Sequence, residues 1–143
     1  MPGFNLNGFL PYQLAVLAAR TSRGFAQRYQ AEFDISIPEW RVLAHLSQHD
    51  AVSVREIHAR VDMDKSKVSR AATRLETRGL VTKTAGSTDK RLVELTLTAQ
   101  GKDLMSRIAP MADDFSAEIE ARLGPDAPAF RAALVKLIET TPG

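Results

Sequence analysis

The sequence predicts a mainly helical protein that carries one small β-hairpin. Over most of the chain, apolar residues recur at three- and four-residue steps, whereas residues 80–97 contain two short alternating segments around a turn-rich stretch. Positive charge gathers near that stretch: residues 65–91 hold eight Lys and Arg against two Asp and Glu, a net charge of +6 in a chain of net +2. Displacing counterions from phosphates requires a local positive potential, so this clustering favours a nucleic-acid-binding surface.

Length and composition are those of one ordinary domain spanning residues 1–143. A chain of this size folds without a covalent staple, and it contains no cysteine, which excludes disulfides, thiol catalysis and cysteine-based redox sensing. Its apolar stretches fall well short of the roughly 20 residues that span a bilayer, and no positively charged segment precedes the first apolar residues. We therefore expect a cytoplasmic protein without a membrane partner.

The N-terminal third of the chain is predicted to form two helices. The first starts near Leu10 and ends near Phe33, because its apolar residues keep a helical spacing. Residues 34–38 break this pattern. Pro38 suits the first turn of a second helix, which is expected to stop around His49.

Two further short helices follow, each with a recognisable start. Ser53 and Glu56 have the spacing of a capping box and open the third helix. Asp64 can cap the fourth helix, and Gly79 suits its C-terminal end. The fourth helix is amphipathic, with an inward face of Val68, Ala71, Ala72 and Leu75 and an outward face of Lys65, Ser66, Lys67, Ser69, Arg70 and Arg74.

The remaining chain is expected to form the hairpin and two more helices. Residues 80–85 and 92–97 are the predicted strands, joined by the turn residues between them. Thr98 opens a long helical pattern that continues to Leu123, and a last helix covers about 127–140.

The first helix and the last two lie outside the helix-turn-helix core yet have broad apolar faces. One subunit is not expected to cover these faces, so residues 9–33 and 98–140 are predicted to be a helical dimerisation region, and residues 38–97 a DNA-binding lobe. A symmetric dimer would present two lobes to a pseudo-palindromic duplex whose half-sites are about 34–36 Å apart.

Several segments of the sequence carry a family resemblance. They are Pro38–Leu43, the run Val54–Arg74, the run Leu75–Val81, and Asp89-Lys90-Arg91 with the following Leu95–Gly101. Together they resemble the MarR family of winged helix-turn-helix transcriptional regulators, over roughly residues 10–137. The resemblance implies a homodimer, with the fourth helix in the major groove, each hairpin wing at the flanking minor groove, and a mostly repressive function.

The resemblance also implies roles for the hairpin tip. Arg91 would insert its guanidinium into the narrow minor groove, Asp89 would orient it through a charge-assisted hydrogen bond, and Lys90 would bind phosphate. An adjacent carboxylate would reduce the rotamer entropy that an exposed arginine loses on binding. Alternatively, Asp89 only satisfies turn amides, and the cationic helix face is only solvated. The candidate DNA-binding residues are Ser53, Lys65, Ser66, Lys67, Ser69, Arg70, Arg74, Asp89, Lys90 and Arg91.

A small-molecule effector is the second partner that the resemblance implies. Members of the family commonly release DNA when an aromatic or phenolic ligand occupies a cleft between the dimer helices and the DNA-binding lobe. By this analogy the effector-binding candidates are Tyr12, Arg20, Phe25, Trp40, His45 and Met105. Aromatic residues at helical spacing are more often core, so Phe25 and Trp40 have that alternative.

Other functions are less well supported by the residues. His45 and His49 have a metal-binding spacing, but the ligand set is incomplete and we expect solvent-facing or capping histidines, with no metal or other cofactor. The sequence shows no glycine-rich phosphate loop, nucleophilic triad or paired catalytic carboxylates, so an enzyme is not expected. A winged-helix dimer that binds small molecules or proteins without reading DNA is the alternative, and the clustered charge counts against it.

Overall fold

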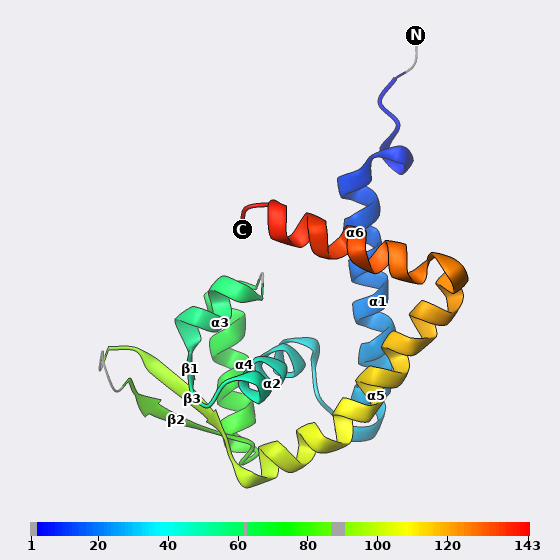
Figure 1. Cartoon of the computed structure of the whole chain (residues 1–143). Helices are drawn as coiled ribbons and strands as arrows, with labels where there is room; N and C mark the ends of the chain where they lie inside the picture. Colours follow the sequence, from blue (N-terminus) through cyan, green and yellow to red (C-terminus); the bar gives the residue numbers. More distant parts are fainter. Residues whose placement is uncertain (1–2, 62, 87–90) are drawn as a thin grey trace. The chain divides into compact units, whose positions relative to one another are not determined.

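The structure, a computed structural model, describes residues 3–61, 63–86 and 91–143 (Figure 1). Most of the chain is helical and three strands form one antiparallel sheet, which confirms the predicted fold class. The elements in chain order are η1 (Leu6–Gly8), α1 (Leu10–Phe33), α2 (Ile37–Gln48), β1 (Val52–Ser53), α3 (Val54–Arg60), α4 (Lys65–Thr77), β2 (Val81–Ala85), β3 (Val93–Leu97), α5 (Ala99–Leu123), η2 (Gly124–Asp126) and α6 (Ala127–Thr140).

The starts of α2, α3 and α4 are set by side-chain caps. The Ser36 hydroxyl oxygen accepts a hydrogen bond from the Glu39 backbone N–H at 3.2 Å, and Ser53 accepts from the Glu56 N–H at 3.1 Å. The Asp64 carboxylate accepts from a backbone N–H at 3.0 Å and from the Ser66 hydroxyl at 2.9 Å, and these hydrogen bonds lower the pKa of the Asp64 carboxyl. Each cap satisfies an N–H that the first helical turn leaves without a partner, as the sequence predicted for α3 and α4.

Burial of the apolar face of α4 forms the centre of the lobe. This helix packs against α2, α3 and β2. Its predicted inward residues Val68, Ala71, Ala72 and Leu75 are all completely buried. They share the core with side chains of neighbouring elements, among them Val42, Leu43, Ile57 and Leu95. The helical periodicity of the sequence therefore identified the buried face correctly.

The hairpin is held in the sheet on one side by a strand that the sequence did not predict. β2 and β3 pair antiparallel, with Val81 opposite Leu97. β1 pairs with the other edge of β3, placing Val52 opposite Leu95 and giving the strand order β1-β3-β2. Two residues are too short to show an alternating pattern, which is why β1 was missed.

The junction of the hairpin with α5 explains the Thr-x-x-Gly start of that helix. The Thr98 hydroxyl donates to the Gly79 carbonyl oxygen at 2.6 Å and accepts from the Gly101 N–H at 3.0 Å. Gly101 is buried, and a Cβ at this position would overlap the Leu80 carbonyl oxygen. Glycine is therefore needed here so that the start of β2 and the first turn of α5 can approach each other closely.

The chain divides into two compact units, Met1–Ile108 and Ala109–Gly143. In the second unit, Arg131 of α6 forms an ion pair with Glu120 and donates to the Ser116 hydroxyl at 3.3 Å, which ties α6 to α5. Both units leave large apolar side chains exposed, namely Phe4, Leu6, Phe9, Leu10, Tyr12, Leu14, Leu17 and Val93 in the first and Phe130, Leu134, Val135, Leu137 and Ile138 in the second. Across the described residues, no helix has the length and apolar character needed to cross a membrane.

Gly101→Ala is expected to destabilise the protein by about 2–3 kcal/mol, because the new methyl group meets a backbone carbonyl that cannot move without shifting β2. Thermal unfolding followed by circular dichroism should show Tm lowered by about 5–10 °C. Gly3→Ala is the matched control, since a Cβ at Gly3 has nothing within 4 Å. Equal Tm values for the two variants would contradict the close approach.

Candidate nucleic-acid interface

The outward side of α4 is a cationic face, which we define by Lys65, Lys67, Arg70 and Arg74. All four residues are exposed, as the sequence predicted, and the buried apolar stripe lies on the other side of the helix. Ser66 is also exposed, and its hydroxyl donates to the Asp64 carboxylate at 2.9 Å, whereas Ser69 is half-buried. The cationic face therefore presents long, charged side chains from a helix whose position the core fixes.

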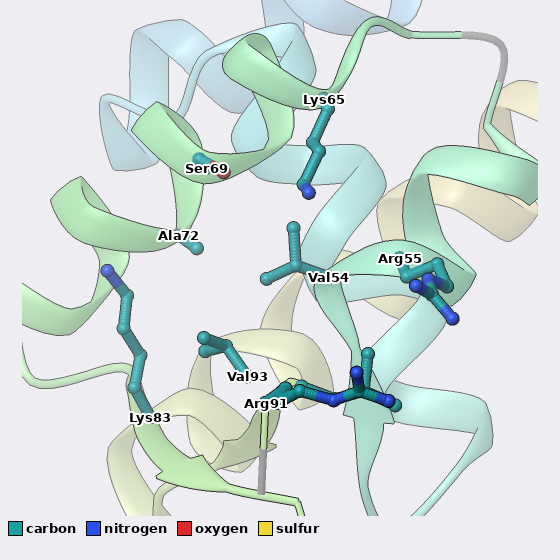
Figure 2. A pocket seen from close by; sticks show the side chains of 9 residues that line it. Val54, Arg55, Lys65, Ser69, Ala72, Lys83, Arg91 and Val93 are labelled. Atoms are coloured by element: carbon teal, nitrogen blue, oxygen red, sulfur yellow. The ribbon is translucent and has the colours of Figure 1, made fainter. Parts of the chain in front are cut away.

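Beside this helix lies a cavity of about 340 Å³, here called the cationic cavity, bounded by α3, α4 and the hairpin. Figure 2 shows Val54 and Val93 in its interior, with Lys65 above them and Arg91 below. No acidic side chain is among the described residues that line it, which are Val54, Arg55, Lys65, Ser69, Ala72, Lys83, Arg91, Leu92 and Val93. Four cations around an apolar floor make the cavity attractive to an anionic group.

Two of these cations were not among the predicted site residues. Arg55 lies in the first turn of α3, and Lys83 lies on β2, where its ammonium donates to the Thr73 hydroxyl at 2.8 Å and is 3.9 Å from a Glu76 carboxylate oxygen. Lys83 was visible in the charge count of the segment. Neither residue is part of the helix-face pattern, so only the fold brings them to the cavity.

The other predicted DNA-binding residues have different surroundings. Ser53 is only 3% exposed, and its hydroxyl caps α3. Arg91 is exposed, whereas Asp89 and Lys90 fall outside the described residues. Arg74 lies with its Nε 3.6 Å from a Glu39 carboxylate oxygen, beside a second cavity of about 680 Å³ that is also lined by Arg78.

Comparison with known proteins places this architecture in a family. The sequence profile of the MarR family matches residues 33–92, which include α2, α3, α4 and β2. A MarR family transcriptional regulator from Silicibacter pomeroyi DSS-3 has a solved structure that superposes with a TM-score of 0.84 at 26% identity, covering 98% of this chain and 100% of that one. The family profile, the similar sequences and the solved structures together support a MarR-family winged-helix transcriptional regulator, a class of DNA-binding protein, as the sequence resemblance indicated.

Two further similarities extend over almost the whole length of the chain. The organic hydroperoxide resistance transcriptional regulator of Bacillus subtilis is 25% identical over 134 residues, covering 92% of this chain and 90% of that protein. The structure of Bordetella bronchiseptica BpsR, described as regulated in its DNA binding by 6-hydroxynicotinic acid, has a TM-score of 0.81 at 20% identity and covers 99% of this chain and 100% of that one. These homologues and neighbours are regulators rather than enzymes.

The predicted effector-binding residues lie in different surroundings. Phe25 is buried and its ring makes an edge contact with the half-buried Trp40, with centroids 5.2 Å apart. Tyr12 and Arg20 are exposed on α1, while His45 and Met105 are half-buried on α2 and α5. None of the six lines either cavity described above. Their role as an effector site stays a prediction.

One aromatic neighbour of these candidates was not predicted as a site residue. Tyr29 is completely buried, with its ring centroid 5.1 Å from that of Phe25 and 5.7 Å from that of Trp40. Its hydroxyl has no hydrogen-bond partner among the described residues, and burial raises the pKa of Tyr29 to about 12. The helical spacing marked Tyr29 only as apolar, so its buried phenol could be recognised as a polar group only in the folded chain.

The histidines have partners within the protein. His49 Nε2 accepts a hydrogen bond from Arg60 at 3.1 Å, and His58 Nδ1 donates to the Met63 carbonyl oxygen at 2.6 Å. Within the described part of the chain, no group of three or more His, Cys, Asp and Glu residues is arranged to hold a metal. The pKa of His45 is lowered by burial, then by the positive charge of Arg60 and by His49.

This lowered pKa predicts a pH-dependent stability. A histidine that binds its proton less tightly in the folded state favours unfolding once protonated, so its contribution is complete above about pH 6.5 and is lost as pH falls below that value. Urea midpoints measured between pH 8 and pH 5 should decrease on the acid side, and His45→Gln should decrease less. A variant that loses stability as steeply as the parent would show that His45 is not responsible.

Proposed function

We propose that the chain is a homodimeric repressor whose α4 helices enter successive major grooves of a pseudo-palindromic operator. The observation that carries this proposal is the charge around α4. Its cationic face is exposed, and the adjoining cationic cavity gathers four cations, with no carboxylate among the described residues that line it. A surface of this kind attracts the phosphate backbone, while an exposed helix of this length fits the major groove.

Within this proposal the predicted residues take separate roles. Lys65 and Lys67 bind phosphates, Arg70 reaches base edges, and Arg91 enters the flanking minor groove. Asp89 and Lys90 keep the orienting and phosphate-binding roles predicted for them, and Ser66 and Ser69 remain candidate contacts. Ser53 supports the interface indirectly, because its buried hydroxyl caps α3.

The dimer is supported by the exposed apolar side chains of both units. Leucines and phenylalanines of the N-terminal segment and of α6 are left in contact with solvent in a single copy. Extended apolar exposure of this kind is typical of an interaction surface, and closed two-fold symmetry is the commonest way to cover it. We propose repression because it is the most common function in the family.

An effector is the final part of the proposal, and an aromatic acid is the class that we favour. Phe25, Trp40 and Tyr29 form an aromatic cluster, and the Tyr29 hydroxyl is a buried polar group without a partner among the described residues. The similar fold of BpsR, whose DNA binding is regulated by 6-hydroxynicotinic acid, supports a ligand of this class. To release DNA, the effector must bind the DNA-free geometry more tightly than the DNA-bound one.

Arg91→Ala is expected to weaken operator binding by at least about tenfold without changing the fold, because the residue is exposed. The probe is a duplex selected from a random library by the parent protein, titrated at fixed salt. Arg107→Ala on α5, which removes an exposed cation paired with Asp103, is the matched control and should bind like the parent. If Arg91→Ala and the control bound alike, the wing contact would be wrong.

Lys67→Ala is expected to weaken selected and unrelated duplexes to a similar extent, since a phosphate contact does not read sequence. The slope of log affinity against log salt should fall by about 1 per subunit. An unchanged slope would argue against a phosphate contact. If the parent protein selects no duplex from the random library, even at low salt, the alternative of a winged-helix dimer that does not read DNA is favoured.

The effector can be tested through Trp40, which is the only tryptophan of the chain. Adding 6-hydroxynicotinic acid or related aromatic acids should change its emission, because Trp40 lies in the aromatic cluster with Phe25 and Tyr29. The ligand Kd should rise when saturating selected duplex is present, since coupling between the two ligands is reciprocal. Identical Kd values with and without DNA would contradict the proposed allosteric release.

A further inference from the structure

Glu39 is a buried carboxylate at the start of α2, and it lies between the ends of two other helices. Its side chain is only 8% exposed. The Ser36 hydroxyl donates to its Oε1 at 2.8 Å, Arg74 Nε is 3.6 Å from the same oxygen, and Arg78 Nη1 is 3.9 Å from Oε2. A carboxylate at this depth needs compensating charge, which comes from Arg74 in the last turn of α4 and from Arg78, the C-cap residue of the same helix.

Arg78 connects this carboxylate to the end of α1. Its Nη1 donates to the Asp34 carbonyl oxygen at 2.8 Å, and its Nη2 donates to the Phe33 carbonyl oxygen at 3.0 Å. The last carbonyls of a helix lack intrahelical partners and carry partial negative charge, so a guanidinium is well suited to bind them. The planar fork of Arg78 thus fixes the end of α4 against the end of α1 and the start of α2.

Arg74 lies one helical turn before Arg78 and belongs to the cationic face. Its side chain is 56% exposed, so it reaches solvent even though its Nε faces Glu39. A guanidinium has five N–H donors, and an interaction through Nε leaves others that can bind a phosphate or a base edge. Glu39 therefore contacts Arg74 from the protein side, in a position to restrict its rotamers before DNA arrives.

From this geometry we infer that Glu39 is a positioning residue for DNA recognition, acting through Arg74. Arg78 binds the C-terminal end of α4 to the end of α1 through its two hydrogen bonds. Glu39 holds the Arg74 guanidinium in the orientation used on DNA. This inference rests on the proposed DNA-binding function and adds to it a residue that does not itself touch DNA.

The sign of the Glu39→Gln effect separates positioning from simple electrostatics. Removing a negative charge beside a DNA-binding face would, by long-range electrostatics alone, tighten binding to any duplex. Loss of positioning predicts the opposite for the selected duplex, with affinity lowered by roughly fivefold to twentyfold, because Arg74 must then lose its rotamer freedom on binding. Glutamine is isosteric and is also accepted in a capping box, so the start of α2 should be retained.

Glu56→Gln is the matched control for this change. Glu56 has in α3 the capping-box position that Glu39 has in α2, and it pairs with Arg60 on its own helix. It is not one of the residues that pair with Arg74 or Arg78 in the contacts described above. We expect Glu56→Gln to bind the selected duplex like the parent. Circular dichroism and thermal unfolding would be measured for both variants, and a retained fold in each makes the binding comparison direct.

A double-mutant cycle with Arg74→Gln provides the decisive measurement. If Glu39 acts through Arg74, the double variant should bind the selected duplex within about twofold of Arg74→Gln alone. Arg74→Lys, which keeps the charge but loses Nε, should reproduce most of the specific loss while preserving affinity for unrelated duplexes. Arg74 is exposed and Arg78 remains beside Glu39 in its variants, and their thermal unfolding would be measured together with that of Glu39→Gln.

Two outcomes would overturn the inference. One is Glu39→Gln binding that equals or exceeds the parent affinity, and the other is a double variant whose loss equals the product of the two single losses. Both outcomes can be measured only if the parent protein selects and binds a duplex. A parent that selects none would instead overturn the proposed DNA-binding function, so the two failures are distinguishable.

Discussion

Burial of one side of α4 is the constraint on which the rest of the lobe depends. Val68, Ala71, Ala72 and Leu75 lie on one stripe of the helix and are fully enclosed by α2, α3 and the sheet. A helix with four buried positions at this spacing cannot rotate about its axis without exposing apolar surface, so its charged residues have one possible direction. The hydrophobic core thereby fixes the orientation of the helix that carries the cationic face.

Local interactions were predictable from the sequence, and interactions between distant residues were not. The caps of α3 and α4 involve residues two or three positions apart, so their residue types and spacing showed them directly. Arg78 and the Asp34 carbonyl are 44 positions apart, and no local pattern connects them. The same reason explains why Arg55 and Lys83 were missed at the cationic cavity, and why the cationic face, which is one periodic helix pattern, was found.

The polar groups of the lobe fall into two functional classes. Lys65, Lys67 and Arg70 are exposed, and their effect is spread through solvent and screened by salt. Glu39 lies in a setting of low solvent access, where hydrogen bonds and ion pairs are stronger and depend on geometry. In the proposed function, the first class controls how strongly the protein is drawn to a polyanion, and the second controls how accurately Arg74 is held on DNA.

The two-residue strand β1 has a consequence for the behaviour of the protein in concentrated solution. β3 is the central strand of the described sheet, since β1 covers one of its edges and β2 the other. An uncovered β3 edge would offer backbone donors and acceptors to a strand from another molecule, a common route to edge-to-edge aggregation. Val52 and Ser53 therefore occupy this edge of β3 at Leu95 and Glu94, so the backbone there is not available to a strand of a second molecule.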